Sequence, residues 1–491
     1  MSSVNRAPDI DPILSSGAKK LRKRKLDNLP WSHSGRHPGN SLFWQIILIM
    51  VRTAWDYIFR RKQIDRLPPF EGGRILTSIH INGLVDPLSI VRTQDRRIIT
   101  MGRHDLMTMP LIGWINRRMG SQPVIRRPEI ESGISDEEYA RTINHRTLLT
   151  MTNCIAAGHN AVVMPEGKSH QDSRLHKFRT GPMRFAINAA AIANQRKSPP
   201  PALQPVGLHY RCHYLFRTDI FVEYPEPIPI SPPSNLDIGK RLIAGDWVEP
   251  PHEQVNALRD DLFDALSMIT PDASDWETYR AWHLISHIRA LGSGKKLETF
   301  RDEVLAARET REMLTSGEIS DATVEPARQA AEILHTNNLD GRSLKVNGIR
   351  THRPWLRCII GLSVMIATSP IVIPSTGIQA AVAWYFGDRT DEGIDARTTY
   401  HMLAAMFSPV LFWPPLAIVI AYFTIGSILA IFPAAIGIML AFHLCNLAFL
   451  VGYDLWTDFA DSGRRTKLAN SDEGELLLRL VADVRSNLNL L

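Results

Sequence analysis

The stretch "RILTSIHINGLVDPLSI" (residues 74–90) joins a β-branched run to a short polar turn and then to an apolar segment. The run "RILTSI" predicts a strand, because branched aliphatic residues favour the extended conformation. The Asn-Gly pair that starts at Asn82 predicts a turn. Asp86 and Pro87 are typical of a helix start, with Asp86 as the N-cap and Pro87 at the first helical position. His80 and Asp86 therefore flank one short loop between a strand and a helix.

Strand-like and helix-like runs continue to alternate through residues 63–232. The other strand-like runs are "RRIITMG", "NAVVMPEG", "ALQPVGLHY" and "DIFVEYPEPI". Between them, residues 137–158 carry apolar side chains at helical spacing and end in a glycine, as helices often do. This alternation predicts an α/β domain with a mainly parallel sheet flanked by helices. Functional residues of such domains gather on loops beyond the strand ends.

His80 and Asp86 are candidates for a proton-transfer pair. So short a loop allows the Asp86 carboxylate to reach one ring nitrogen of His80, which leaves the other nitrogen as a general base. A His and an Asp at this spacing also occur by chance, so the pair alone is weak evidence. Two later stretches, "VIRRPE" and "MPEGKSHQDSRLHKFRTG" (164–181), supply cations suited to a phosphate-bearing substrate.

Five blocks occur in a fixed order: "H-x-N-x-x-x-D-P", "G-x-x-P-V-x-R", "P-E-G", "F-R-T-G" and "P-V-G". Together they resemble the phospholipid/glycerol acyltransferase superfamily, which esterifies glycerol 3-phosphate or lysophosphatidate with an acyl thioester. The resemblance implies that His80 takes the proton of the acceptor hydroxyl and that Asp86 holds the imidazole. It also implies acceptor binding by the residues matching the remaining block positions: Asn82, Arg126, Glu166, Gly167 and Arg179.

Two departures from the common family pattern bear on the acceptor. Five residues separate His80 from Asp86 where four are usual, which resembles a branch acting on glycerol 3-phosphate or dihydroxyacetone phosphate. The third block has Met164 in place of phenylalanine and lacks the usual arginine, so the acceptor stays open. The implied reaction uses acyl-CoA or acyl carrier protein as co-substrate and needs no metal or other cofactor.

The N-terminal 62 residues are basic and then apolar. Residues 1–39 include "KKLRKRK" and predict a disordered tail, with a nucleic-acid arm or a lipid-attracted cluster as alternatives; we expect no nucleic-acid partner. Residues 40–62 predict one helix. Its apolar run of ten residues is short of the ~20 that cross a bilayer, so an interfacial membrane helix is favoured over a buried core helix.

The C-terminal half changes from charged to membrane-like. Residues 233–350 predict charged helices without a catalytic cluster, and hence a packing or regulatory role. Residues 351–456 predict two to four transmembrane helices, since no Asp, Glu, Lys or Arg lies between Met402 and Gly452. Arginines on both flanks favour cytosolic ends and an even number of spans. Residues 457–491 predict a cytosolic C-terminal helix. A buried hairpin in a soluble protein is the alternative.

The predicted protein is an integral membrane O-acyltransferase whose active domain faces the cytosol. It would transfer a fatty acyl group to glycerol 3-phosphate in glycerophospholipid synthesis, with lysophosphatidate as the second choice of acceptor and membrane lipids as partners. A non-enzymatic membrane tether would not require the five ordered blocks. A permease would need more polar groups in its spans. The four cysteines lie far apart and indicate neither a zinc site nor a disulfide framework.

Overall fold

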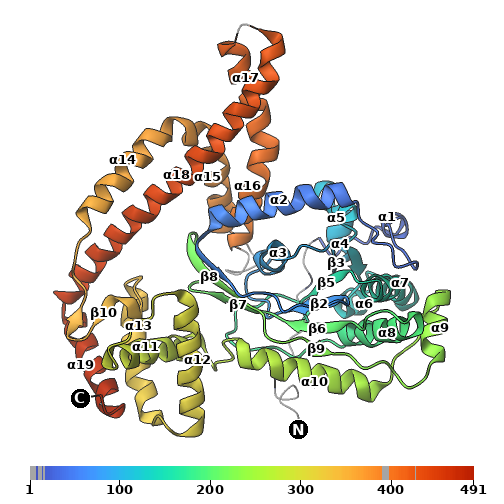
Figure 1. The fold of residues 1–491 in the computed structure, drawn as a ribbon, viewed down its shortest axis with the longest axis horizontal. Helices are drawn as coiled ribbons and strands as arrows, with labels where there is room; N and C mark the ends of the chain where they lie inside the picture. The colour runs from blue at the N-terminus through green and yellow to red at the C-terminus, as the bar shows by residue number, and fades with distance from the viewer. Residues whose placement is uncertain (1–6, 9–13, 15–16, 390–396, 426, 491) are drawn as a thin grey trace.

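The computed structural model describes the chain except residues 1–6, 9–13, 15–16, 390–396, 426 and 491. It contains an α/β domain, a smaller helical domain beside it, and long apolar helices that project from both (Figure 1). The predicted fold class is therefore confirmed.

The main sheet has six strands in the order β4-β3-β5-β2-β6-β9. All neighbouring pairs are parallel except β6 with β9, so the sheet is mainly parallel as predicted. Strands β2 and β5 are adjacent, and the loops that follow them are neighbours at the carboxyl edge of the sheet. The bounds are β2 Arg74–Thr77, β3 Ile98–Arg103, β4 Gln122–Val124, β5 Asn160–Val163, β6 Ala202–Pro205 and β9 Ile228–Pro229.

A second sheet has three strands in the order β1 (Phe59–Ile64), β8 (Thr218–Glu223) and β7 (Gly207–Tyr210). The run "ALQPVGLHY", predicted as one strand, is thus divided between β6 and β7, which belong to different sheets. Pro205 is where β6 ends, and a proline has no backbone N–H with which to extend a ladder.

Helices cover both faces of the sheets. Helices α2 (Ser41–Ile58) and α3 (Val85–Arg92) lie on one face, and α8 (Gly181–Arg196) and α10 (His252–Ile269) lie on the other (Figure 1). Helix α7 (Glu137–Ala156) ends before Gly158, whose φ of +89° explains the predicted glycine stop. Helix α8 was not predicted, because nearly all of its residues from 182 to 193 are buried and no polar face marks its period.

Helix α2 is shorter than predicted, since the chain enters β1 at Phe59. One of its faces packs into the main core through the buried residues Trp44, Ile47, Val51 and Trp55. The opposite face leaves large apolar side chains in the open: Leu42 is 70 % exposed and Ile49 is 63 % exposed. The helix is therefore part of the domain core and also offers an apolar outer surface.

Residues 17–39 of the predicted disordered tail are folded against the domain, and the call for residues 1–6, 9–13 and 15–16 lies outside the described residues. A short helix, α1 (Lys23–Asp27), buries Leu26 in a cluster that includes Ile143. The Nζ of Lys23 lies 2.8 Å from a carboxylate oxygen of Asp136. The prediction of disorder is wrong for this segment because it counted charge and overlooked the isolated leucines that anchor the chain.

The helical domain is assembled from two distant parts of the chain. Helix α11 (Trp276–Gly292) packs against α12 (Phe300–Ser316) and α13 (Val324–Thr336). Helices α11 and α13 also pack against α19 (Asp472–Asn487), and these three share one apolar core. The region predicted as 233–350 is thus not one unit, because α10 belongs to the core of the α/β domain. The C-terminal segment closes the helical domain.

Three stretches are long and apolar enough to cross a membrane: Trp355–Gly387, Arg397–Thr424 and Leu429–Ala469. They comprise α14 (Trp355–Val372), α15 (Ile378–Gly387), α16 (Arg397–Phe407), α17 (Trp413–Thr424) and α18 (Ile428–Ala469). Three lies within the predicted range of two to four. Helix α18 continues well past the predicted boundary at residue 456.

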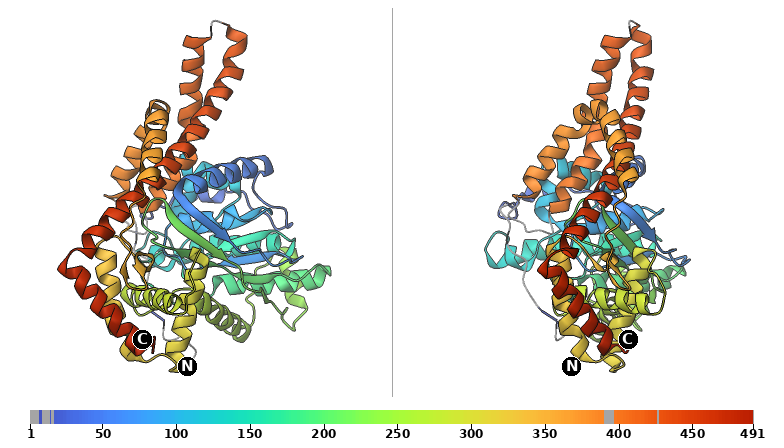
Figure 2. Two further views of the ribbon diagram at one scale, coloured as in Figure 1. Left: turned by 60° about the vertical axis from the view of Figure 1, so that its left-hand side comes forward. Right: turned by 90° about the vertical axis from the view of Figure 1, so that its left-hand side faces the viewer.

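The apolar stretches leave the body of the protein and return to it. The start of α14 lies beside the end of α18, with the rings of Trp355 and Phe459 4.4 Å apart. Between these ends the chain comes back to the α/β domain at Thr398, which contacts Asn82. The two excursions are the bent pair α14–α15 and the projecting hairpin of α16–α17 with α18 (Figure 2). Each excursion leaves the folded domains and comes back to them. Three helices that each crossed a membrane once would instead leave the chain on the side opposite to where it started.

Candidate active site

His80 and Asp86 are in contact, as the sequence predicts. The Nδ1 of His80 lies 3.0 Å from Oδ2 of Asp86. Asp86 is the second residue of α3, and the N-cap is Leu84 rather than Asp86 as predicted. In the first turn its carboxylate faces the positive end of the helix dipole. The local chain therefore delivers the carboxylate to the ring from inside the helix.

The Asp86 carboxylate is completely buried and receives three hydrogen bonds. Besides His80, the backbone N–H of Asn82 donates to it at 2.7 Å and the Tyr210 hydroxyl donates at 2.7 Å. Burial, followed by the nearby Asp86 carboxylate, raises the pKa of Tyr210 well above its usual value, so this hydroxyl stays protonated and keeps donating. A buried carboxylate without such donors would be costly.

The imidazole of His80 is held by one nitrogen only. A hydrogen bond from Nδ1–H to Asp86 leaves the lone pair on Nε2, which has no partner among the described residues. The side chain is 17 % exposed, so this nitrogen is accessible to a substrate. The arrangement is that of a general base with its acceptor nitrogen presented outward.

Glu166 fixes the backbone of the His80 loop. It lies in the turn after β5, and its Oε2 accepts the backbone N–H of His80 at 2.9 Å. Its Oε1 accepts from Nε2 of His170 at 2.9 Å and from the backbone N–H of His176 at 2.7 Å. Because the Glu166 side chain is completely buried, it acts on the site through His80 and not by direct contact with a substrate.

The amide of Asn82 is also used inside the protein. Its Nδ2 donates to the backbone carbonyl of His213 at 2.9 Å, and its Oδ1 accepts the hydroxyl of Thr398. The neighbouring Thr399 hydroxyl accepts the backbone N–H of Leu84 at 3.1 Å. Both threonines begin α16, so a helix of the apolar region closes over the loop that carries His80.

The three other predicted binding residues, Arg126, Gly167 and Arg179, lie on loops at the same carboxyl edge. Arg126 follows β4, and its Nε and Nη2 bind Oε1 of Glu129 at 3.0 and 2.6 Å. Gly167 has a φ of +77°, and a Cβ there would lie 3.3 Å from Cγ of Arg179. The backbone N–H of Arg179 donates to Pro165 at 2.8 Å, which folds the segment back over this turn.

The family assignment follows from a comparison with family models. Residues 59–208 match the model described as Acyltransferase, and this range contains every predicted site residue. The chain carries a domain of the acyltransferase family. The match runs from β1 to the start of β7 and includes five of the six strands of the main sheet, while β8 and β9 lie beyond it.

Other comparisons add little to this assignment. The chain is similar to the crystal structure of the 1-acyl-sn-glycerophosphate (LPA) acyltransferase PlsC from Thermotoga maritima. The TM-score is 0.31 and the identity 13 %, over 46 % of this chain and 78 % of that one. A likeness this distant carries no argument about function. No curated protein matches the sequence.

One histidine cluster in the acyltransferase domain has metal-like spacing. Ligand atoms of His170, Asp172 and His176 lie within 4.8 Å of one another, and the two rings stack 3.9 Å apart. Yet Nδ1 of His170 accepts the N–H of Asp172 and Nε2 donates to Glu166, so both nitrogens are already in use. Burial and the neighbouring His170 lower the pKa of His176, which keeps its ring neutral. These contacts suit a support for Glu166.

Sequence reasoning missed four residues that support the site: Tyr210, Thr398, His170 and His176. His170 and His176 carried a signal, because both fall in the quoted stretch "MPEGKSHQDSRLHKFRTG". Tyr210 and Thr398 carried none, since they are 124 and 316 residues away from the side chains that they contact.

Proposed function

We propose that the protein is a membrane-bound O-acyltransferase that transfers a fatty acyl group from acyl-CoA or acyl carrier protein to glycerol 3-phosphate. The observation that supports it most directly is the 3.0 Å contact of His80 with the buried Asp86, with Nε2 of His80 left open to a substrate. In this proposal the acyltransferase domain faces the cytosol, where both thioester donors and glycerol 3-phosphate are dissolved.

The proposed chemistry is a direct acyl transfer. Nε2 of His80 takes the proton of the acceptor hydroxyl while the oxygen of that hydroxyl attacks the carbonyl carbon of the thioester. The tetrahedral intermediate collapses, the C–S bond breaks, and the leaving thiolate receives the proton from His80. Base catalysis contributes typically about 10² to 10⁴-fold, and holding the two substrates together contributes more. The reaction needs no metal and no covalent enzyme intermediate.

The acceptor phosphate would be bound at the carboxyl edge by Arg126 and Arg179. Glu129 holds the Arg126 guanidinium through Nε and Nη2, and this leaves Nη1 for a phosphate oxygen. Glu166 and Gly167 contribute by shaping the turn beneath His80 rather than by charge.

Lysophosphatidate is the second candidate acceptor, and one observation favours it. Helix α16 of the apolar region lies against the His80 loop, and the exposed apolar face of α2 lies on the same domain. An acceptor that is itself a lipid would reach the site along these helices without leaving the membrane.

Product identification tests both acceptors. Membranes containing the protein are incubated with acyl-CoA and labelled glycerol 3-phosphate, and in parallel with labelled lysophosphatidate. We expect acylated product from glycerol 3-phosphate and its loss in the His80→Ala variant. If only lysophosphatidate gives an acylated product, lysophosphatidate and not glycerol 3-phosphate is the acceptor. Absence of thiol release with either acceptor would favour a tether or permease.

A further inference from the structure

A large open cavity lies away from the active site. It has a volume of about 1150 Å³ and is enclosed by β1, the helical domain, the start of α14 and the end of α18. None of His80, Asp86 or Glu166 lines it. The sequence offered no role for this part of the helical region beyond packing or regulation.

The lining of the cavity is strongly cationic. Ten arginines and lysines line it against five carboxylates, so it attracts anions. The cations are Arg60, Arg61, Lys62, Lys295, Lys296, Arg342, Arg350, Arg353, Arg357 and Arg465, and the carboxylates are Glu298, Glu303, Asp340, Asp458 and Asp461.

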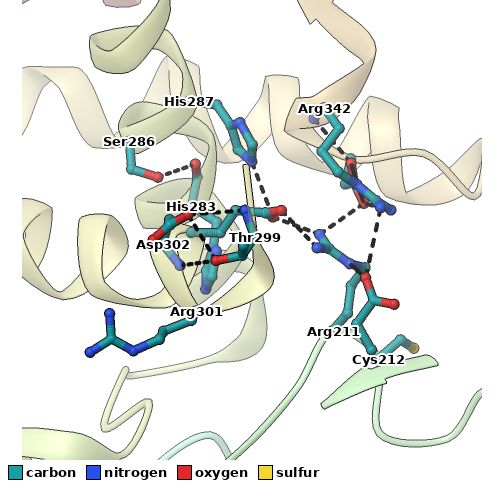
Figure 3. Close-up of polar contacts among 12 residues, drawn as sticks. Arg211, Cys212, His283, Ser286, His287, Thr299, Arg301, Asp302 and Arg342 are labelled. Carbon is teal, nitrogen blue, oxygen red and sulfur yellow. Dashed lines mark hydrogen bonds and ion pairs between the residues drawn. The ribbon is translucent and has the colours of Figure 1, made fainter. Parts of the chain in front are cut away.

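The cavity-lining residues His287, Glu303, Asp340 and Arg342 belong to a network of paired charges that also includes Arg211 (Figure 3). Both Nη atoms of Arg211 bind Glu303, at 2.6 and 2.7 Å, and Nη2 of Arg342 binds Asp340 at 2.7 Å. His287 adds a contact to Glu303 at 3.3 Å. This network joins the α/β domain to the helical domain, and its charged groups are paired with one another.

Four of the lining cations are not paired with a carboxylate among the described residues, and we call these four the rim of the cavity. The exposed side chains of Arg61, Lys295, Arg353 and Arg357 have no carboxylate partner among the described residues. They come from β1, the segment between α11 and α12, and the start of α14, and they face one space. Four converging cations without counter-charges suit a phosphate group, which accepts several charge-assisted hydrogen bonds.

An apolar surface begins where the cationic rim ends. Trp355 and Leu356 also line the cavity and are 57 % and 71 % exposed. The exposed apolar side chains continue along α14 through Ile359 (59 %) and Ile366 (70 %). A free phosphate ester would leave this surface unused, whereas a phospholipid would cover it with its acyl chains.

We propose that the cavity binds the phosphate headgroup of an anionic phospholipid whose acyl chains lie along the outer face of α14. The rim cations hold the phosphate, and the lipid joins the helical domain to the start of the membrane region. The site is separate from His80, so the proposal does not depend on the proposed reaction.

The test compares two double variants of the full-length protein in neutral detergent. Arg353→Gln with Arg357→Gln removes two rim cations. Arg141→Gln with Arg241→Gln removes two exposed cations, on α7 and α9 (Asp237–Ala244), that do not line the cavity. Each protein is titrated with phosphatidylglycerol, phosphatidylcholine and soluble glycerol 3-phosphate, and bound molecules are counted by native mass spectrometry.

We expect the rim variant to bind phosphatidylglycerol about tenfold or more weakly than the control variant, at about 1 kcal/mol for each cation lost. Binding of phosphatidylcholine should be weak and equal in both. Equal affinity of the two variants for phosphatidylglycerol would overturn the proposal, as would binding of glycerol 3-phosphate at the rim as tight as that of the lipid. The His80→Ala variant should bind phosphatidylglycerol normally even if it has lost all activity.

Discussion

The loop that carries His80 and the cavity beside α14 are both polar, but they are built in opposite ways. Around His80 the two acidic side chains are buried and fully bonded: Asp86 has three donors and Glu166 has three donors. Around the cavity, Arg353 and Arg357 are exposed and lack carboxylate partners among the described residues. Catalysis needs one atom held in one direction, whereas capture of an anion needs charge that is free to adapt.

The largest effect on activity is expected at His80, because only Nε2 of its ring is presented to a substrate. The His80→Ala variant should lose acyl transfer by about 10² to 10⁴-fold or more, because no other described side chain presents a free base next to Asp86. Its thermal unfolding should change only modestly, because the buried Asp86 loses the donor on the His80 ring but keeps those of Asn82 and Tyr210. Thiol release from acyl-CoA measures the rate, and an unchanged rate would contradict the assignment.

The Asp86→Asn variant tests whether the buried carboxylate orients the imidazole of His80. The new amide has one oxygen where the carboxylate has two. With that oxygen toward Tyr210, its NH2 group takes the place of Oδ2, so the Asn82 N–H loses its acceptor and the imidazole meets a donor that favours the wrong ring tautomer. We expect kcat to fall by about 10² to 10⁴-fold with a smaller change in KM. Thermal unfolding of the variant distinguishes a misoriented imidazole from a loss of fold.

Arg211→Met probes the network under the cavity, where charges are paired rather than free. It would leave Glu303 buried without its guanidinium, a loss of about 3–5 kcal/mol in unfolding free energy. Denaturant titration measures it, with the exposed Arg141→Met as control. A loss below 1 kcal/mol would show that the two domains are joined mainly by other contacts.

The same network predicts how the unfolding free energy depends on pH. Burial raises the pKa of Glu303, but the hydrogen bonds from His287 and Arg211 outweigh it and lower the pKa to about 2. Stability from this carboxylate is therefore fully present above its unfolded pKa near 4.5 and is lost as the pH falls toward 2. Unfolding measured across this range should show less acid sensitivity in Glu303→Gln.

The smallest effect is expected at Thr398, the apolar region's contact with the active-site loop. Thr398→Val removes one buried hydrogen bond to Asn82, worth about 1 kcal/mol. We expect kcat to fall by a few-fold, with Thr399→Ser as the conservative control because it keeps the hydroxyl that accepts from Leu84. An unchanged kcat would indicate that α16 covers the loop without positioning it.

Contacts between residues close in sequence could be predicted, whereas contacts between distant segments could not. The contact of His80 with Asp86 was within reach because a short loop leaves few alternatives. The parallel sheet was predicted because its strands are short runs of branched residues bounded by turns. Tyr210, Thr398 and the pairing of Arg211 with Glu303 were not, since each links segments that only the packed fold brings together.

The errors have equally local causes. A search for periodic hydrophobicity cannot find α8, which is buried on nearly all sides. It also cannot find the tail around Leu26, where single leucines do the anchoring. The helical domain was divided at the wrong places because α19 joins its core only after the chain has passed through the apolar region.

The bond between Thr398 and Asn82 limits how this protein can be dissected. A soluble fragment that stops at residue 350 would keep the whole family-matched range, yet it would lack α16 above the His80 loop and α19 in the helical core. The enzyme's hydrophobic anchor is thus also a part of its working framework, and expression strategies that treat the two as separable modules should yield a loosened, less active product.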